Sequence, residues 1–245
     1  PELVIPFKLD KQAAVTALKK YYRGKKFLPK TFCEQNHIEE IQGVYVPFWL
    51  CDCQVDGTVT YHATNSRTWK EGDYEITETD HYQVDRSGRI GFERIPVDAS
   101  TKMPDAHMDA IEPYDYNELR AFSTAYLPGF LADKYDVSQQ DSMARIETRA
   151  ENSAEMELRN TVSGYEAVHL QDRSFRFRKS NMKYTLMPVW MLSTKWNGRN
   201  FLFAMNGQTG KLIGDLPVDK GKYFAWFAGI ALPLMAIILG FWFLL

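Results

Sequence analysis

Two thiols and one imidazole are the residues whose types and spacing best fit metal chemistry. Cys51 and Cys53 are two positions apart, so a strand would place both thiols on one face, and a hairpin could bring His62 back toward them. Cys33 and His37 lie upstream as further possible ligands. Structural zinc sites usually present paired Cys-x₂₋₄-Cys knuckles, so the pattern favours buried structural cysteines. Cys51, Cys53 and His62 are therefore weak metal candidates.

Phosphate binding and hydrolysis have less support. Residues 207–211 contain the glycines, threonine and lysine of a phosphate-binding loop. Only two residues separate the glycines, however, and strands are expected on both sides, so a β-turn is predicted. The sequence has no Gly-x-Ser-x-Gly or His-Glu-x-x-His motif, and its five histidines stand singly. We assign no catalytic or cofactor-binding residue and expect that the chain is not an enzyme.

A repeated Pro-x-Trp is the strongest local pattern. Residues 46–50 match residues 187–191, and each copy ends in a tryptophan followed by one apolar residue. Large aromatic residues on strands usually pack in a core. Alternatively, Trp49 and Trp190 could line a groove that binds a strand of a protein partner.

Two helices are marked by their ends. The first is predicted over residues 11–22, with Asp10 as N-cap, and the second over residues 138–162. A basic run at residues 19–26 straddles the end of the first helix. Its cations either complement the helix dipole or contact anionic lipid headgroups.

Strand-rich segments follow both helices. Hairpin turns are predicted at Asp56-Gly57 and Asn197-Gly198, with a further turn at Ser87-Gly88. Because helix and hairpin recur in the same order, we predict an α+β fold: two related units, each a helix plus an antiparallel meander, followed by a C-terminal transmembrane helix. The predicted ranges are 1–100 for the first unit, 101–137 for a packed connection, 138–218 for the second unit and 223–245 for the transmembrane helix.

The C-terminal segment differs from the rest in composition. All 29 Lys and Arg and all 31 Asp and Glu lie before residue 223. About 20 apolar residues of helix cross a bilayer core, so residues 223–245 are predicted to bind the lipid bilayer as a span. Basic and aromatic residues near its ends are expected at the membrane interface: Lys220, Lys222, Tyr223, Trp226 and Trp242.

Charge and cysteine content place the body of the protein. Lysines before the span predict a cell-membrane protein with its body on the cytoplasmic side. Three cysteines without disulfide spacing fit the reducing environment of that compartment. The formal net charge of −2 gives no basic stripe, so we expect no nucleic-acid binding by this segment.

Several segments together resemble the zinc-ribbon membrane proteins of Gram-positive bacteria, often labelled TFIIB-type zinc-ribbon or primosomal helicase proteins. These segments are residues 1–9, 28–30, 42–49, 95–100, 111–114, 125–130 and 203–216. The resemblance implies an N-terminal ribbon of two Cys-x-x-Cys knuckles, which is absent from residues 1–245. Zinc is therefore expected only in that ribbon, and no cofactor is expected in this chain. Residues 206–214 also resemble, more faintly, a PepSY-type module, a class thought to bind or inhibit partners.

Some members of this family are encoded beside SPFH-type or phage-shock membrane-stress proteins, which implies a membrane-associated protein partner of those types. The patterns together predict a membrane-anchored, cytoplasm-facing adaptor or scaffold in envelope stress or membrane organisation. The alternative is a nucleic-acid-associated zinc-ribbon protein, in which the missing ribbon binds nucleic acid and this body is a membrane-tethered spacer.

Overall fold

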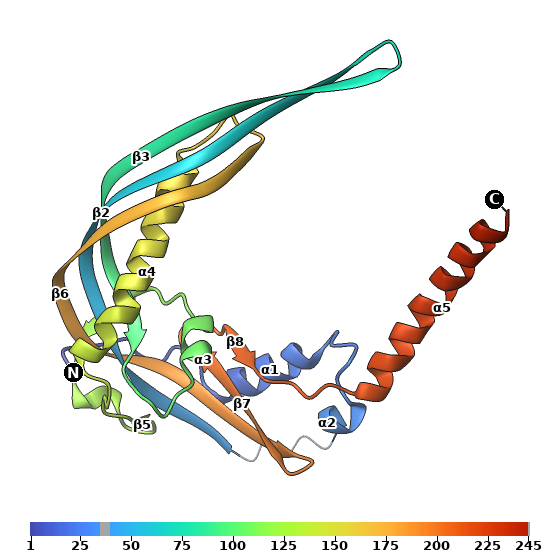
Figure 1. Ribbon diagram of the computed structural model, residues 1–245. Helices are drawn as coiled ribbons and strands as arrows, with labels where there is room; N and C mark the ends of the chain where they lie inside the picture. The colour runs from blue at the N-terminus through green and yellow to red at the C-terminus, as the bar shows by residue number, and fades with distance from the viewer. Residues whose placement is uncertain (35–39, 245) are drawn as a thin grey trace. The chain divides into compact units, whose positions relative to one another are not determined.

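The computed structural model describes the backbone of residues 1–34 and 40–244 and the side chains of residues 1–32 and 41–240 (Figure 1). Its elements in chain order are β1 (Leu3–Val4), α1 (Lys11–Tyr22), α2 (Lys30–Glu34), β2 (Glu40–Glu71), β3 (Tyr74–Asp98), α3 (Asp105–Ala110), β4 (Arg120–Ala121), β5 (Leu131–Ala132), α4 (Gln139–Asn160), β6 (Ala167–Trp196), β7 (Arg199–Asn206), β8 (Leu212–Gly214) and α5 (Lys220–Leu244). Two 3₁₀ turns, Tyr116–Glu118 and Thr124–Tyr126, flank β4.

The strands of the described residues form one mixed sheet of eight strands. Its main order is β3-β2-β6-β1-β4, while β5 pairs with β2, β7 with β6, and β8 with β7. The predicted α+β fold of two helix-plus-meander units is therefore wrong. The two segments thought to be separate hairpins are the long strands β2 and β6, which are neighbours in a single, mostly β architecture.

The error arose at Asp56-Gly57, which is not a turn. β2 and β3 pair from Phe48↔Asp98 to Glu71↔Tyr74 with one register shift, between Cys51 and Cys53, and the chain reverses at Gly72, where φ is +63°. The Asp56 carboxylate accepts a hydrogen bond from Arg89 at 2.6 Å. Gly57 leaves room for a ring, because a Cβ there would lie 2.6 Å from Phe175. The turn residues thus serve side-chain pairing and close packing within the sheet.

Other local predictions are confirmed. The predicted first helix is α1, and the Asp10 side chain accepts from the Ala13 amide as N-cap. The Asn197-Gly198 turn connects β6 to β7, with positive φ at both residues. By contrast, the predicted turn at Ser87-Gly88 lies inside β3, paired with β2.

Two compact units divide the chain, and each is discontinuous in sequence. Unit 1 contains residues 1–4, 47–101 and 134–186, and unit 2 contains residues 5–46, 102–133 and 187–245. These boundaries differ from the contiguous ranges 1–100 and 138–218 expected above. The chain passes between the units next to Pro47 on β2 and next to Pro188 on β6, the prolines of the repeated motif.

In unit 1, α4 lies along one face of the sheet (Figure 1). Ser138 caps the helix by accepting from the Asp141 amide. The buried positions of α4 are spaced three or four residues apart, as an amphipathic helix requires: Ser142, Ile146, Ala150, Ala154 and Leu158. They pack on inward-facing residues of β2 and β3, including both cysteines, which form the core of this unit.

In unit 2, α1 packs on β7 and on part of β6. Ala14 and Leu18 of α1 contact Trp190, Phe203 and neighbouring apolar residues in a second core. The unit ends in α5, which contains within residues 220–240 an 18-residue window with a mean hydropathy of 1.9, and no part of that window is buried. In the described part of the chain, this is the one helix long and apolar enough to span a membrane.

Candidate functional site

The strongest candidate site lies in unit 2, where a basic segment meets the start of α5. Residues 19–30 contain six Lys and Arg and no Asp or Glu. Two more lysines stand at the start of α5, beside one carboxylate, Asp219. We call these eight cations the basic collar: Lys19, Lys20, Arg23, Lys25, Lys26, Lys30, Lys220 and Lys222. All but Lys222 are exposed.

Residues 23–28 bring the two halves of the collar together. The carbonyl oxygen of Phe27 accepts a hydrogen bond from the Asp219 amide at 2.8 Å. The ammonium group of Lys222 donates to the carbonyl oxygen of Leu28 at 2.7 Å. Since Leu28 is itself buried in the core of unit 2, this segment fixes the first turn of α5 to the folded body.

Aromatic rings strengthen the same junction. Phe27 and Tyr223 meet edge to face, with ring centroids 5.8 Å apart. The ammonium group of Lys26 lies 4.5 Å from the ring centroid of Trp226 in α5. The ammonium group of Lys25 lies 4.9 Å from the ring centroid of Tyr21 in α1. Asp219 accepts from the Lys222 amide and so caps α5. Cations and aromatic side chains thus meet at the start of the apolar helix.

Of the predicted interface residues, Lys220 and Lys222 belong to the basic collar, and Tyr223 and Trp226 lie beside them. Lys220, Lys222, Tyr223 and Trp226 all lie in the first two turns of α5. The side chain of Trp242 lies outside the described residues. The sequence offered Lys25 and Lys26 as part of a basic run that caps α1 or contacts lipid headgroups, but it did not indicate that Lys26 and Phe27 contact α5. What it lacked was the contact with α5, because nearly 200 residues separate the two segments in sequence.

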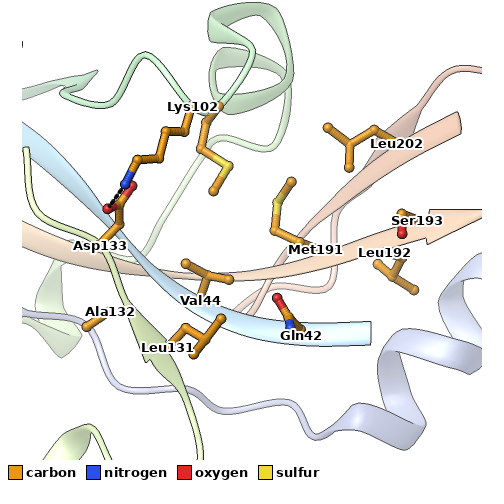
Figure 2. A pocket seen from close by; sticks show the side chains of 11 residues that line it. Gln42, Val44, Lys102, Leu131, Ala132, Asp133, Met191, Leu192, Ser193 and Leu202 are labelled. Atoms are coloured by element: carbon orange, nitrogen blue, oxygen red, sulfur yellow. Dashed lines mark hydrogen bonds and ion pairs between the residues drawn. The ribbon is translucent and has the colours of Figure 1, made fainter. Parts of the chain in front are cut away.

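A second feature of unit 2 is an apolar cleft of about 440 Å³ (Figure 2). That volume falls in the range of small-molecule pockets. Its polar rim includes the ion pair of Lys102 and Asp133, whose charged atoms lie 2.6 Å apart. The lining residues come from β2, β5, β6, β7 and the segment before α3: Gln42, Val44, Lys102, Met103, Leu131, Ala132, Asp133, Met191, Leu192, Ser193 and Leu202. The lining is therefore mostly apolar side chains around one Lys–Asp ion pair.

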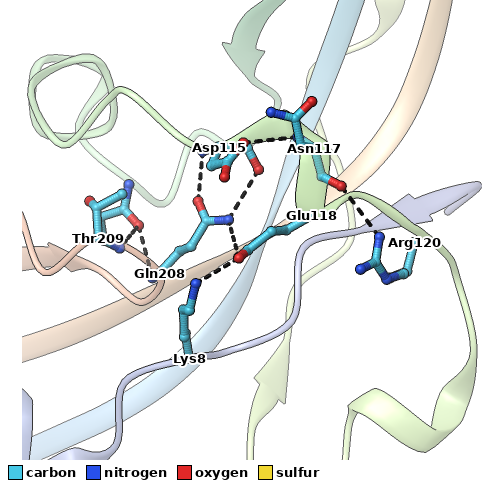
Figure 3. Close-up of polar contacts among 8 residues, drawn as sticks. Lys8, Asp115, Asn117, Glu118, Arg120, Gln208 and Thr209 are labelled. Carbon is cyan, nitrogen blue, oxygen red and sulfur yellow. Dashed lines mark hydrogen bonds and ion pairs between the residues drawn. The ribbon is translucent and has the colours of Figure 1, made fainter.

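The glycine-rich segment 207–211 forms the predicted turn between β7 and β8. Its Gln208 side chain is buried and donates to Glu118 at 2.6 Å and to the Asp115 carbonyl oxygen at 3.1 Å (Figure 3). Lys8 donates to the same Glu118 carboxylate. The hydrogen bond from Lys8 and, to a smaller extent, that from Gln208 lower the pKa of Glu118. The side chain of Lys211 donates to the Glu112 carbonyl oxygen. These groups bind one another, which makes the network a structural one.

The metal candidates are not brought together. Cys51 and Cys53 are buried against α4 in unit 1, whereas His62 lies on the opposite face of β2 and contacts His81, with ring nitrogens 3.1 Å apart. A hydrogen bond from Cys53 lowers the pKa of Cys51, and the same contact together with burial raises that of Cys53. His37 and the side chain of Cys33 lie outside the described residues. Among the described residues, no cluster of three metal-ligating side chains occurs.

The two repeated tryptophans are packing residues. Trp49 is 4% exposed in unit 1 and donates its indole N–H to the Val137 carbonyl oxygen at 3.0 Å. Trp190 is 6% exposed in unit 2 and donates to the Leu9 carbonyl oxygen at 2.9 Å. Each is thus buried and hydrogen-bonded inside its own unit, and Trp190 also lines an open cleft of unit 2 with Ile41 and Phe130.

Comparison with known proteins adds one relative. No model of a known protein family matches the chain, and no solved structure matches it. The uncharacterized protein YdjG of Bacillus subtilis (strain 168) is 39% identical over 231 residues, which cover 94% of this chain and 68% of YdjG. An identity of this size over nearly the whole chain includes both units and the start of α5. The chain therefore belongs to the same protein family as YdjG.

Proposed function

We propose that the protein is a membrane-anchored adaptor whose body faces the cytoplasm, with the basic collar resting on anionic lipid headgroups. The observation that carries this proposal is the docking of residues 23–28 onto the first turns of α5. Through it, cations distant in sequence from the apolar helix stand where that helix would enter the bilayer.

Electrostatics supports this orientation. The cytoplasmic leaflet carries anionic lipids, and each Lys or Arg near its surface contributes about 1 kcal/mol. Seven of the eight collar cations are exposed and remain available for headgroups. The aromatic residues Tyr223 and Trp226 have the amphipathic character that favours the interface. In the sequence, only two of these cations, Lys220 and Lys222, stand next to the span and so count toward the positive-inside rule.

The adaptor role rests on the family resemblance described above. A protein partner of the SPFH or phage-shock type, acting in envelope stress or membrane organisation, is the partner class that this resemblance favours. The described residues offer a binding surface, the apolar cleft of unit 2, without an evident catalytic group. Co-purification of the full-length protein from membranes, followed by identification of stoichiometric partners, tests the role. Recovery of the protein alone from native membranes would contradict it.

Sidedness has its own experiment. A cysteine introduced at Ser66, an exposed position of unit 1, is treated with a membrane-impermeant maleimide in intact cells and after permeabilisation. We expect labelling only after permeabilisation. Labelling in intact cells, or recovery of the protein in the soluble fraction without detergent, would overturn the proposal.

Lipid contact is tested with full-length protein in nanodiscs. We expect a higher thermal midpoint with phosphatidylglycerol than with phosphatidylcholine, because only the former attracts the collar. The double variant Lys25→Glu, Lys26→Glu should lose most of this difference. Lys70→Glu, an exposed lysine of β2 in unit 1, is the matched control and should keep it. Equal loss in both variants would argue against a specific collar.

A further inference from the structure

The long hairpin of unit 1 has an acidic outer edge. β3 is last in the strand order, so its outer edge has no partner strand among the described residues. Residues 71–83, the hairpin turn and the distal part of β3, contain five carboxylates and no Lys or Arg. All five are exposed: Glu71, Asp73, Glu75, Glu78 and Asp80. Only Glu78 has an ion pair within the described chain, to Arg67.

The opposite edge of the same three strands is basic. β6 pairs with β1 only at Thr185 and Leu186 and with β7 only from Val189 onward, so the described structure leaves its outer edge before residue 184 without a partner strand. Residues 173–183 contain five basic residues and no Asp or Glu. All five are exposed: Arg173, Arg176, Arg178, Lys179 and Lys183. Arg173 and Arg178 have ion pairs within the described chain, to Glu155 and Asp56.

Long unpaired edges tend to recruit further strands unless they are blocked. Neither edge segment contains proline. Each carries charge of a single sign, which disfavours pairing with a strand of like charge and favours a strand of opposite charge. The strand parts are similar in length, since ten residues of β3 (74–83) extend about 33 Å and eleven of β6 (173–183) extend about 36 Å. β3 and β6 run in the same direction, because β2 is antiparallel to both. Against β3, this follows from the register of the paired residues. Against β6, the later residue Thr64 of β2 lies at Glu166, just before β6, whereas the earlier residue Gly57 lies at Phe175, further along β6.

We propose that the acidic β3 edge of one copy pairs with the basic β6 edge of a second copy of this chain. Because β3 and β6 run in the same direction, copies with the same orientation in one membrane would pair these edges as parallel strands. The contact is heterologous, so each added copy leaves one acidic and one basic edge open and rows can grow. Like charges oppose the alternative pairings of β3 with β3 and of β6 with β6. The inference goes beyond the adaptor role and does not depend on it.

Two charge-reversed variants of the full-length chain test this pairing in detergent micelles by sedimentation velocity. The acidic-edge variant is Glu75→Lys with Asp80→Lys, and the basic-edge variant is Arg176→Glu with Lys179→Glu. None of the four side chains has an ion pair in the described structure, so the fold should tolerate the changes. We expect the wild type to self-associate and each variant alone to do so at least about tenfold more weakly.

Mixing the two variants is the decisive arm. In the mixture, the unchanged basic β6 edge of the acidic-edge variant can pair with the unchanged acidic β3 edge of the basic-edge variant, so the two variants should form heterodimers with near wild-type strength. Their association should also weaken as salt is raised, because exposed charges are screened. When isolated native membranes are treated with a copper–phenanthroline oxidant, which accepts the two electrons, a disulfide should form between Thr77→Cys on one copy and Ser180→Cys on another.

Three results would overturn the proposal. The first is a wild-type protein that stays monomeric up to about 100 μM, a concentration above the micromolar dissociation constants of ordinary specific contacts. The second is self-association that both variants leave unchanged. The third is failure of the mixture to restore association. The second result would mean that copies associate through α5 or another surface. If the protein stays monomeric and its acidic β3 edge instead binds a different, basic protein, that protein would be the partner of the edge. Fractionation and maleimide labelling are read separately, so the adaptor proposal can stand or fail independently.

Discussion

Lys26 lies with its ammonium group 4.5 Å from the ring centroid of Trp226, although 200 positions separate the two residues in sequence. This contact joins the segment after α1 to the second turn of α5. It brings the basic run of the first helix to the membrane-spanning candidate, and so turns two separate sequence patterns into one surface.

The junction predicts a local change in amide exchange. Phe27→Ala removes the edge-to-face contact with Tyr223, and such pairs contribute about 0.5–1.5 kcal/mol. We expect the Asp219 amide, which donates to the Phe27 carbonyl oxygen, to exchange roughly two- to tenfold faster in hydrogen–deuterium exchange. Lys19→Ala, an exposed change in α1, should leave that amide unaffected. Equal protection in both variants would mean that the segment does not hold α5.

The repeated tryptophans should behave as core residues. Trp49→Phe and Trp190→Phe each remove an indole donor from a carbonyl oxygen, which costs about 1–3 kcal/mol when the group left behind is buried. Trp69→Phe in the exposed hairpin should change stability by less than about 0.5 kcal/mol. Guanidinium unfolding followed by near-UV circular dichroism measures the differences. A neutral Trp49→Phe or Trp190→Phe would contradict the core assignment.

Acid should weaken the network around Glu118. Hydrogen bonds from Lys8 and then Gln208 lower the pKa of this carboxyl below its ordinary value of 4.5 in the folded chain. A carboxyl whose pKa is lower in the folded chain stabilises the folded state at any pH above its ordinary pKa. That stabilisation is lost as the pH falls through the folded-state pKa. We therefore expect the wild type to exceed Glu118→Gln in thermal midpoint at pH 7 and to converge with it in strong acid.

Lys8→Met is the companion variant for this network. It removes the largest cause of the shift, so the pKa of Glu118 should rise toward 4.5 in a carboxyl-detected NMR titration. A titration of Glu118 that is the same in the wild type and in Lys8→Met would exclude the ion pair as that cause.

Gly57 of β2 and Gly91 of β3 form a matched pair for testing how the Phe175 ring of β6 packs on β2. A Cβ at Gly57 would lie 2.6 Å from the Phe175 ring, so Gly57→Ala should destabilise the protein by about 1–3 kcal/mol. A Cβ at Gly91 meets nothing within 4 Å, and Gly91→Ala should stay within about 0.5 kcal/mol of the wild type. Chemical denaturation compares the two. If Gly57 were a flexible turn residue, both variants would behave alike.

Local chemistry determined several parts of this protein from sequence alone. The cap at Asp10, the helix after Ser138 and the Asn197-Gly198 turn depend on nearby residues, and each appears where it was predicted. The uniformly apolar residues 223–240 likewise specify a helix long enough for a bilayer.

Tertiary structure decided the features that depend on distant partners. Asp56-Gly57 has the residues of a turn, but Arg89 and the Phe175 ring hold it extended. The hairpin predicted there is therefore one long strand, β2, beside β6. The same dependence separates His62 from the two cysteines and brings Lys26 to Trp226. A sequence shows which residues favour a turn, a strand or an interface. Which surfaces they form depends on packing between segments far apart in the chain, and no local pattern contains that information.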